Sequence, residues 1–522
     1  MLRLFRKRIS FLPLFTWGDA GVLATGVVAY IAIVSATITK FSVWFDEAFG
    51  SYLVRFDILS LTRYTANDVH PPFYYWILKA WTTVFGNTEL GIRSMSVFFA
   101  VVTIIALFLF VLRLFGRKAA YLSLLFLALS PMFIRYGQEA RMYTLLTAIV
   151  VIASYLLVYA VETKKRWAWI WYGILVALGM LTQYLVALVW AAHFLWLVIT
   201  ARKPRASLKA SLKQTFSKQV VIAYGTAFAL FSLWLPFLVI QFLTIQGHGF
   251  WIKPVTATTV TDFIANVLLF SDAQSTSSWI ALIFLVLVGF VSYLTYRMLR
   301  QLHGDERRNY LLIVCIVALP AILLFLLSMP PLRSAFVDRY LLSSVVFIAP
   351  LVAVGLTMSR KAIGKKLYYG TIVAFTLLMV IGIVNQSVTG NYNKASLQSN
   401  NTRQLLEAIR GNSENSAPIL TTTPWIYYEA SIYDKASSPI YYVNEIIEYK
   451  YGSLTALAEN ETHKIRDLDA FTMNLKEVWV IGNLRDTAPR PLRDNWQEQE
   501  SIVINDDVSK KPLFKAVKFS VE

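Results

Sequence analysis

The sequence predicts a polytopic α-helical membrane protein that ends in a smaller α/β domain. Of the 522 residues, 57% are hydrophobic and only 15% are charged, which is too apolar a composition for a soluble globular protein. Several windows of about 20 apolar residues could each cross a hydrocarbon core of roughly 30 Å. From residue 388 onward the chain is polar. We therefore expect a membrane domain, residues 1–387, and a soluble domain, residues 388–522.

Eleven apolar segments are predicted to cross the cytoplasmic membrane of the cell. Lys and Arg concentrate in alternate loops between these segments and in the N-terminal flank, which is typical of cytoplasmic loops. The first segment is interpreted as a retained signal anchor. We therefore expect a cytoplasmic N-terminus and an extracytoplasmic C-terminal domain. The segments are 20–39, 93–112, 119–133, 141–161, 167–181, 184–200, 220–240, 279–297, 310–327, 339–358 and 367–384.

The net charge of +18 does not indicate a protein that binds nucleic acid. The predicted cytoplasmic loops account for most of the positive charge, and no basic patch is interleaved with aromatic residues. The single cysteine, Cys315, lies inside an apolar segment, which excludes an intrachain disulfide.

The soluble domain alternates between short helical and extended patterns, which is typical of an α/β fold. It contains no glycine-rich phosphate loop, so nothing in it indicates a nucleotide site. Helices are predicted over 402–409, 425–433 and 453–459, and strands over 418–423, 439–443 and 476–481.

The first outer loop, residues 40–92, carries an unusual set of polar residues. Asp46 and Glu47 follow the first apolar segment, and Asp68 and His70 precede two prolines. Carboxylates at a bilayer surface are costly unless they are solvated, paired or functional. The aromatic run 73–81 is too short to span and is interpreted as a helix lying in the membrane interface.

Two other loops are predicted on the same outer side, and both combine acidic and basic residues. Together, the three loops offer carboxylates for acid–base work or a metal, and guanidinium groups for a phosphate. The candidates are Arg135, Glu139, Arg141 and Tyr143 in residues 134–143, and Asp338, Arg339 and Tyr340 in residues 330–340.

Each candidate also has a purely structural interpretation. Asp46 and Glu47 could form the polar end of an interfacial helix, and His70 could cap a turn. Glu139 and Arg141 could pair only with each other. Arg339 could extend from a helix end toward the membrane surface.

The loop motifs resemble bacterial glycosyltransferase family 39 of the GT-C superfamily, which is related to protein O-mannosyltransferases and lipid A aminoarabinose transferases. The resemblance covers mainly the first 200 residues, with a weaker match later in the chain, and the soluble domain contributes nothing to it. The matching residues are Trp44-Phe45-Asp46-Glu47, Asp68 to Tyr75, Arg93, Arg135 to Tyr143, and Asp338-Arg339-Tyr340.

This resemblance implies a GT-C-like fold and a polyprenyl-phosphate sugar donor used outside the cytoplasmic membrane. It implies that Asp46 matches the catalytic aspartate of the first loop. Some relatives hold a divalent metal with carboxylates at this place, so Mg²⁺, Mn²⁺ or Zn²⁺ is the cofactor that the resemblance leaves open. Asp46 and Glu139 would be its ligands.

The chemistry of the reaction leads to the same assignment. A sugar phosphate brings its own leaving group, so the protein needs a base for the acceptor hydroxyl and cations for the departing phosphate. We assign Asp46 and Glu47 to catalysis, with Asp46 as the base, and expect inversion from a single displacement. The acceptor would be a protein, a glycolipid or a cell-envelope glycan. The predicted substrate-binding residues are Asp68, His70, Arg93, Glu139, Arg141, Tyr143, Asp338, Arg339 and Tyr340.

A transporter or flippase of lipid-linked sugars is the alternative. Transporters tend to place ionisable groups and broken helices at the middle of the bilayer. Here the charged residues cluster at the ends of the predicted spans. Whether Glu47, Asp68 and His70 hold a metal, hold the acceptor or only shape the loop stays open at this point.

Overall fold

All eleven apolar segments are mainly helical, because a segment inside a bilayer can satisfy its backbone N–H and C=O groups only within itself. The computed structural model describes residues 10–202, 207–248, 252–270, 278–389, 401–412, 417–443, 456–457, 462–484, 487–506 and 510–521. The first part of the helical region consists of α1 (Trp17–Ser35), α2 (Phe45–Leu53), α3 (Ile58–Ala66), α4 (Phe73–Phe85), α5 (Glu89–Phe115), α6 (Arg117–Ala128), α7 (Pro131–Gly137), α8 (Tyr143–Thr163) and α9 (Arg166–Met180).

The second part of the helical region extends to residue 389. It consists of η1 (Tyr184–Val186), α10 (Ala187–Ala201), α11 (Leu208–Thr215), α12 (Lys218–Phe231), η2 (Ser232–Trp234), α13 (Leu235–His248), α14 (Thr259–Leu269), α15 (Ser278–Gln301), α16 (Gly304–Leu327), η4 (Asp338–Leu341), α17 (Leu342–Val345) and α18 (Ile348–Thr389).

The number of clear spans is smaller than the eleven predicted. Among the described residues, seven helical segments are long and apolar enough to cross a membrane, or eight if the bent pair α6 and α7 counts as one span. The axes of this pair differ by 61°, and Pro131 begins the second helix. The other three predicted segments correspond to α9, which has only 15 residues, to α15, and to the second half of α18. The two halves of α18 meet at Gly364, whose φ of 79° interrupts the helix.

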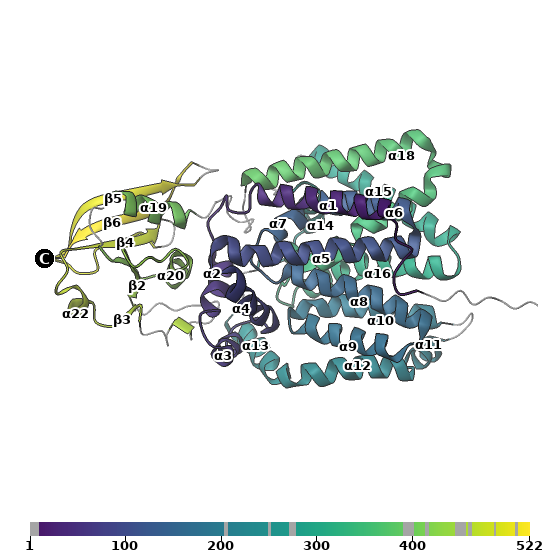
Figure 1. The fold of residues 1–522 in the computed structure, drawn as a ribbon, viewed down its shortest axis with the longest axis horizontal. Helices are drawn as coiled ribbons and strands as arrows, with labels where there is room; N and C mark the ends of the chain where they lie inside the picture. Colours follow the sequence, from purple (N-terminus) through teal and green to yellow (C-terminus); the bar gives the residue numbers. More distant parts are fainter. Residues whose placement is uncertain are drawn as a thin grey trace, which may run out of the picture.

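Helix α8 forms the centre of the bundle. Within its apolar window 89% of the residues are buried, compared with 17% for α1 and 56% for α5. Figure 1 shows α8 between α5 and the pair α9 and α10. The loop that precedes α8 therefore lies near the axis of the bundle.

Beyond α18, a six-stranded sheet forms the part that we call the sheet domain, described between residues 401 and 521. The strand order is β3-β2-β1-β4-β6-β5; the first four strands run parallel, and β6 is antiparallel to both of its neighbours. The strands are β1 (Ile419–Thr421), β2 (Ile440–Val443), β3 (Lys464–Ile465), β4 (Glu477–Asn483), β5 (Gln497–Asn505) and β6 (Pro512–Ser520), and the helices are α19 (Thr402–Asn412), α20 (Pro424–Ser431) and α22 (Leu468–Thr472).

The sequence patterns located most of this domain. The helices predicted over 402–409 and 425–433 and the three predicted strands are confirmed as α19, α20, β1, β2 and β4. The helix predicted over 453–459 lies outside the described residues except for 456–457. The hairpin of β5 and β6 was not predicted, although β5 alternates in exposure along its length, as expected for an edge strand with one solvated face.

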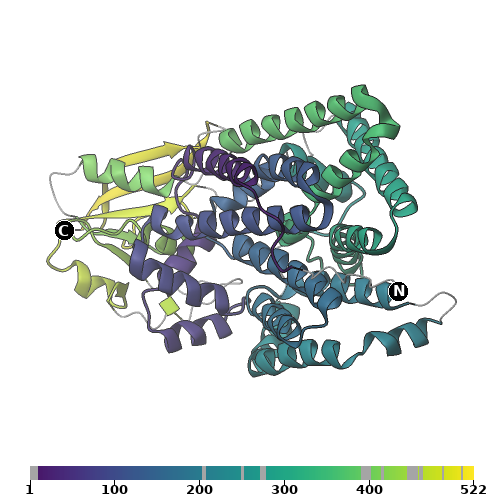
Figure 2. The same ribbon diagram turned by 45° about the vertical axis from the view of Figure 1, so that its right-hand side comes forward.

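The sheet domain packs against one end of the bundle, and we call this end the sheet end. Helices α2, α3 and α4, which form the first loop, lie there, and α20 of the sheet domain lies next to α2 (Figure 1). The turned view in Figure 2 shows the same contact between the two parts of the molecule. The first loop is thus enclosed between the bundle and the sheet domain.

Helices α9 and α12 approach each other closely at Gly173, and this contact yields a stability prediction. A Cβ atom at Gly173 would overlap the backbone carbonyl of Ala223, and small residues are what allow membrane helices to approach so closely. We expect Gly173→Ala to separate the helices and to lower the free energy of unfolding by about 1–3 kcal/mol. The thermal unfolding midpoint in detergent should fall. Gly225→Ala on α12 is the matched control, because nothing lies within 4 Å of its added Cβ; equal midpoints for the two variants would contradict the packing.

Candidate active site

A buried ion pair between Glu47 and Arg93 organises the first loop. Arg93 Nε donates to Glu47 Oε1 at 2.8 Å, and Arg93 Nη2 donates to Glu47 Oε2 at 2.7 Å. Glu47 Oε1 also accepts from the backbone N–H of Ala140 at 2.8 Å. Both side chains of the pair are fully enclosed. Glu47 therefore joins the first loop to α5 and to the loop before α8.

The rest of the Arg93 guanidinium is also occupied. A planar guanidinium has five N–H donors, and here the remaining donors bind the backbone at the start of the first loop and one carboxylate on α5. Arg93 was predicted to bind substrate, but its guanidinium binds only protein groups among the described residues, which gives it a structural role. Its remaining acceptors are the carbonyl oxygens of Ile38 (2.7 Å), Phe41 (2.9 Å) and Ser42 (3.2 Å), and Glu89 Oε1 (2.7 Å).

Asp46, next to Glu47, has a different environment. It lies in the first turn of α2, and its side chain is 24% exposed. Arg141 Nη2 lies 3.7 Å from its carboxylate, and Arg141 Nη1 donates to its backbone carbonyl at 3.1 Å. Adjacent positions on a helix point in different directions, so one carboxylate of the pair is buried while the other stays accessible. Of the two, only Asp46 can be reached by a substrate.

Asp68 and His70 hold Arg141 in place. His70 Nε2 lies 3.2 Å from Arg141 Nη2, and His70 Nδ1 lies 3.1 Å from Asp68 Oδ2. A guanidinium can only donate, so His70 Nε2 must accept and Nδ1 carries the proton that it donates to Asp68. The hydroxyl of Tyr75 accepts from Arg141 Nη1 at 3.5 Å. These contacts form a chain from Asp68 through His70 and Arg141 to Asp46.

Glu139 is a buried carboxylate with few partners. It is fully enclosed, and its only ion pair in the described part of the chain is with Arg135 Nη2 at 3.6 Å. Neither of its carboxylate oxygens accepts a hydrogen bond from the described residues. Burial, opposed by the charge of Arg135, raises the pKa of Glu139 to about 7. The alternative interpretation, in which Glu139 pairs only with Arg141, does not hold, because the Glu139 carboxylate faces Arg135.

The third loop supplies Arg339, which is 6% exposed. Its guanidinium lies over the rings of Trp44 and Tyr340, 5.8 Å from each centroid, a distance at which a cation is attracted to the face of an aromatic ring. Asp338 points elsewhere, since its Oδ2 accepts from Asn266 Nδ2 on α14 at 2.8 Å. Arg339 and Arg141 thus reach the neighbourhood of Asp46 from different loops.

Residues 69–237 match the model of a family described as dolichyl-phosphate-mannose-protein mannosyltransferase. An uncharacterized protein of Aquifex aeolicus (strain VF5) is 30% identical over 141 residues, which is 27% of this chain. The chain spans 28% of the length of that curated relative. The matched family region includes His70, Glu139, Arg141 and Tyr143, but not Asp46 or Arg339.

Two solved structures are similar over nearly the whole chain. The crystal structure of ArnT from Cupriavidus metallidurans in the apo state has a TM-score of 0.58 at 12% identity and covers 96% of this chain and 98% of that chain. The structure of ArnT bound to undecaprenyl phosphate has the same TM-score and identity and covers 95% and 98%. The chain therefore shares the fold of ArnT. The predicted fold class, a polytopic membrane protein with a C-terminal α/β domain, is thereby confirmed.

Within this fold, the structure brings together residues from all three predicted loops. Asp46 is the partly exposed member of this site, and the buried side chains of Arg141 and Arg339 lie beside it. Glu47 and Arg93 pair with each other in the interior. Tyr143, the first residue of α8, is buried with its ring 5.2 Å from that of Tyr136. The sequence reasoning missed Glu89, Tyr75 and Asn266 as partners of these residues, and an acid four positions before Arg93 was the one local signal available for Glu89.

The carboxylates of the site do not form a metal centre. Among the residues that the structure describes, no three His, Cys, Asp or Glu side chains lie where they could share one metal ion. Asp46 and Glu139, the predicted ligand pair, each face an arginine, and Asp68 and His70 bind each other. This arrangement does not fit a divalent cation.

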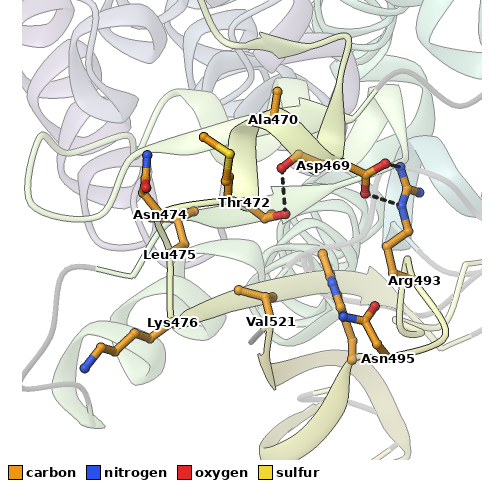
Figure 3. Close-up of a pocket in the computed structure, with 11 residues that line it drawn as sticks. Asp469, Ala470, Thr472, Asn474, Leu475, Lys476, Arg493, Asn495 and Val521 are labelled. Carbon is orange, nitrogen blue, oxygen red and sulfur yellow. Dashed lines mark hydrogen bonds and ion pairs between the residues drawn. The ribbon is translucent and has the colours of Figure 1, made fainter.

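A separate hollow of about 690 Å³ lies on the sheet domain, and Figure 3 shows the residues that line it. Its most prominent contact is the ion pair between Asp469 and Arg493, with Arg493 Nε 2.6 Å from Asp469 Oδ1. None of the residues around Asp46 lines this hollow. It is therefore not part of the candidate active site.

The raised pKa of Glu139 yields a prediction for stability. Its pKa lies at about 7, above the ordinary value of 4.5, so the folded state binds this proton more tightly than the unfolded chain. The free energy of unfolding should therefore fall by about 3 kcal/mol in total as the pH rises from the ordinary pKa of 4.5 to the raised pKa of about 7. A glutamine side chain cannot ionise, so Glu139→Gln does not lose stability in this way. The thermal unfolding midpoint of the variant should therefore rise relative to that of the unsubstituted protein as the pH increases. This difference between the two midpoints should become constant above the pKa of Glu139.

Glu306→Gln on α16 is the control, because Glu306 is exposed; its difference from the unsubstituted protein should not change over the same pH range. A constant difference for Glu139→Gln as well would show that Glu139 is ionised throughout.

Proposed function

We propose that this chain is a membrane glycosyltransferase that moves a sugar from a polyprenyl-phosphate donor to an acceptor hydroxyl outside the cytoplasmic membrane. The observation that carries the proposal is the combination of one accessible carboxylate, Asp46, with two buried cations, Arg141 and Arg339, drawn from three loops at one end of a GT-C bundle. The match of residues 69–237 to a mannosyltransferase family supports the same class of donor.

The acceptor hydroxyl would attack the anomeric carbon of the donor sugar, with Asp46 taking the hydroxyl proton as the new C–O bond forms. The bond between the anomeric carbon and the phosphate oxygen breaks, and the electron pair leaves with the polyprenyl phosphate. A carboxylate is a weak base, but it can accept the proton late, when the sugar carbon has already gained positive charge. One displacement of this kind inverts the anomeric centre.

Arg141 and Arg339 would bind the phosphate as its negative charge increases. Guanidinium groups bind phosphate oxygens through charge-assisted hydrogen bonds, which are stronger in an enclosed site than in water. Arg141 Nε is buried and donates to none of the described residues, so a phosphate oxygen that reached it would displace no existing contact. ArnT was solved with undecaprenyl phosphate bound, and a lipid phosphate of this kind is the leaving group that we propose for this chain.

Glu47, Asp68 and His70 would act as positioning residues. Glu47 is enclosed and bound to Arg93 and Ala140, so it cannot touch a substrate. Asp68 and His70 fix the side chain of Arg141, which in turn holds Asp46. The loop thus places the base and one phosphate ligand at a fixed separation before the substrates bind, which lowers the entropy lost in reaching the transition state.

The distribution of basic residues supports an orientation for the protein. Basic side chains lie at the end of α5, at the starts of α6 and α16 and beside the kink of α18, namely Arg113, Arg117, Arg308 and Lys365. These helix ends lie away from the sheet domain (Figure 1), and basic residues are typical of the cytoplasmic side. The site and the sheet domain would then face the extracytoplasmic side. The acceptor, a protein, glycolipid or envelope glycan, would arrive from that side.

Asp46→Asn should reduce transfer by about 10²–10⁴-fold, because it removes the base while preserving the shape of the side chain. The assay is release of polyprenyl phosphate from a radiolabelled polyprenyl-phosphate sugar by purified protein in the presence of a cell-envelope acceptor fraction. Asp305→Asn is the matched control, since Asp305 is exposed at the first turn of α16, where its carboxylate pairs with Arg308 one turn further along the same helix. Near-normal release of polyprenyl phosphate by Asp46→Asn would contradict the assignment of Asp46 as the base. Transport of the intact donor across the membrane without this release would favour the flippase alternative.

Arg339→Gln should weaken inhibition by the product, polyprenyl phosphate, by about 10–100-fold, because a charge-assisted hydrogen bond contributes roughly 1.5–3 kcal/mol. The measurement is the inhibition constant of added polyprenyl phosphate in the same assay. Arg300→Gln is a suitable control, since Arg300 also lies over an aromatic ring, that of Tyr296, but on α15 away from the site. An unchanged inhibition constant for Arg339→Gln would place the phosphate elsewhere.

A further inference from the structure

The sheet domain binds the first loop through two side chains, Arg403 and Tyr433. Arg403 lies at the start of α19, and Tyr433 lies just beyond α20. Both reach across to the same carboxylate, Glu89, at the first position of α5. No feature of the sequence pairs residues so far apart, and the loop motifs that indicated the site lie entirely outside the sheet domain.

Glu89 joins the two parts of the molecule. Its Oε1 accepts from Arg93 Nη1 at 2.7 Å, and its Oε2 accepts from Arg403 Nη1 at 2.8 Å and from the Tyr433 hydroxyl at 3.0 Å. The Glu89 side chain is only 10% exposed. A carboxylate that is this enclosed and bound by three donors is held firmly, because losing any donor leaves a buried charge with incomplete compensation.

The same two residues also bind the backbone that leads to Asp46. The Tyr433 hydroxyl accepts from the N–H of Val43 at 2.8 Å, three residues before Asp46. Arg403 Nη2 donates to the carbonyl of Thr39 at 3.0 Å, and the backbone N–H of Arg403 donates to the Ser42 hydroxyl at 3.2 Å. Arg93 binds the neighbouring carbonyls from the opposite side. Residues 38–43 are therefore held between the bundle and the sheet domain.

The sheet domain also packs directly against helix α2. The ring of Tyr428 on α20 packs edge-on against Phe49 and Tyr52, with centroids 5.6 and 4.9 Å apart. Arg55, just beyond α2, donates to the carbonyl of Ser431 at 2.7 Å. The sheet domain thus contacts the chain before and after Asp46.

We propose that Arg403 and Tyr433 are positioning residues, through which the sheet domain holds α2 so that Asp46 faces Arg141 and Arg339. The sheet domain is then part of the catalytic unit and does more than present a surface to an acceptor. The catalytic half of this proposal rests on the proposed function, whereas the structural half, that these two side chains restrain α2, does not.

The test compares Tyr433→Phe and Arg403→Gln with Arg493→Gln in the full-length protein. Arg493 pairs with Asp469 inside the sheet domain, so its substitution removes an arginine–carboxylate contact that does not reach the first loop. The first measurement is hydrogen–deuterium exchange over residues 39–53. Exchange should rise in both test variants and stay unchanged in the control, and the Val43 amide should respond most to Tyr433→Phe, because it loses its acceptor.

The second measurement is transfer. The kcat of both test variants should fall about tenfold, as expected when a catalytic group is misplaced, while the KM for the donor changes little, since neither residue touches the phosphate ligands. Arg403→Lys, which keeps the positive charge, should recover part of the kcat. A purely stabilising role would instead lower the amount of folded protein without changing the kcat of what remains.

The outcomes separate the two proposals. Unchanged exchange over residues 39–53 in both variants would overturn the restraint, and raised exchange with normal kcat would overturn its catalytic role. If the unsubstituted protein releases no polyprenyl phosphate at all, the proposed function fails, yet the exchange measurement still decides whether the sheet domain holds the first loop.

Discussion

The buried network of Glu47, Arg93 and Glu89 is the constraint on which the rest of the site depends. Two carboxylates flank one guanidinium, and every charged group is enclosed. Removing one partner from a buried ion pair is strongly destabilising, because the remaining charge is left in a medium of low polarity. The network therefore fixes three pieces of chain relative to one another: the start of the first loop, helix α5 and the loop before α8. Asp46 is adjacent to Glu47 in the first turn of α2, so the same network fixes its position.

Burial divides the acidic residues of the site into different roles. Glu47 is bound to Arg93 and inaccessible, Glu139 is enclosed with a raised pKa, and Asp68 is bound to His70. Asp46 alone among these four is partly exposed beside a cation. Of these four carboxylates, three are enclosed by the protein, and only that of Asp46 is accessible to a substrate. The same reasoning separates Arg93, which binds only protein, from Arg141, which retains a donor for a ligand.

The sheet domain belongs to the same network, although its sequence carries no motif of the site. It was expected as a separate α/β unit beyond the last span, and its parallel strands and helices fit that expectation. What the packing adds is the contact of Arg403 and Tyr433 with Glu89, across more than 300 positions of the chain. The sheet domain therefore contacts the same part of the first loop that Arg93 holds from the bundle.

The sequence by itself determined the membrane helices, the α/β character of the C-terminal part and the three loops that meet at the site. These follow from local patterns: apolar runs of spanning length, the alternation of basic residues between loops, and short helical and extended periods. It also singled out Asp46, Arg141 and Arg339 in the outer loops, because a carboxylate beside guanidinium groups suits acid–base work and phosphate binding. Its count of eleven spans exceeds the seven or eight clear spans in the described residues. Apolar composition marks a segment as a candidate span, but it does not show that a helix such as α9 is short or that the pair α6 and α7 is bent.

Only the tertiary structure decided which acidic side chain pairs with which basic side chain. Glu47 pairs with Arg93 rather than with a substrate, Glu139 faces Arg135 rather than Arg141, and Glu89, which sequence reasoning passed over, joins the bundle to the sheet domain. These choices depend on contacts between residues far apart in the chain, and on whether a side chain ends in a packed interior or at an open surface. Local pattern determines where a helix forms, but only the packing of all helices determines which of two adjacent carboxylates remains accessible.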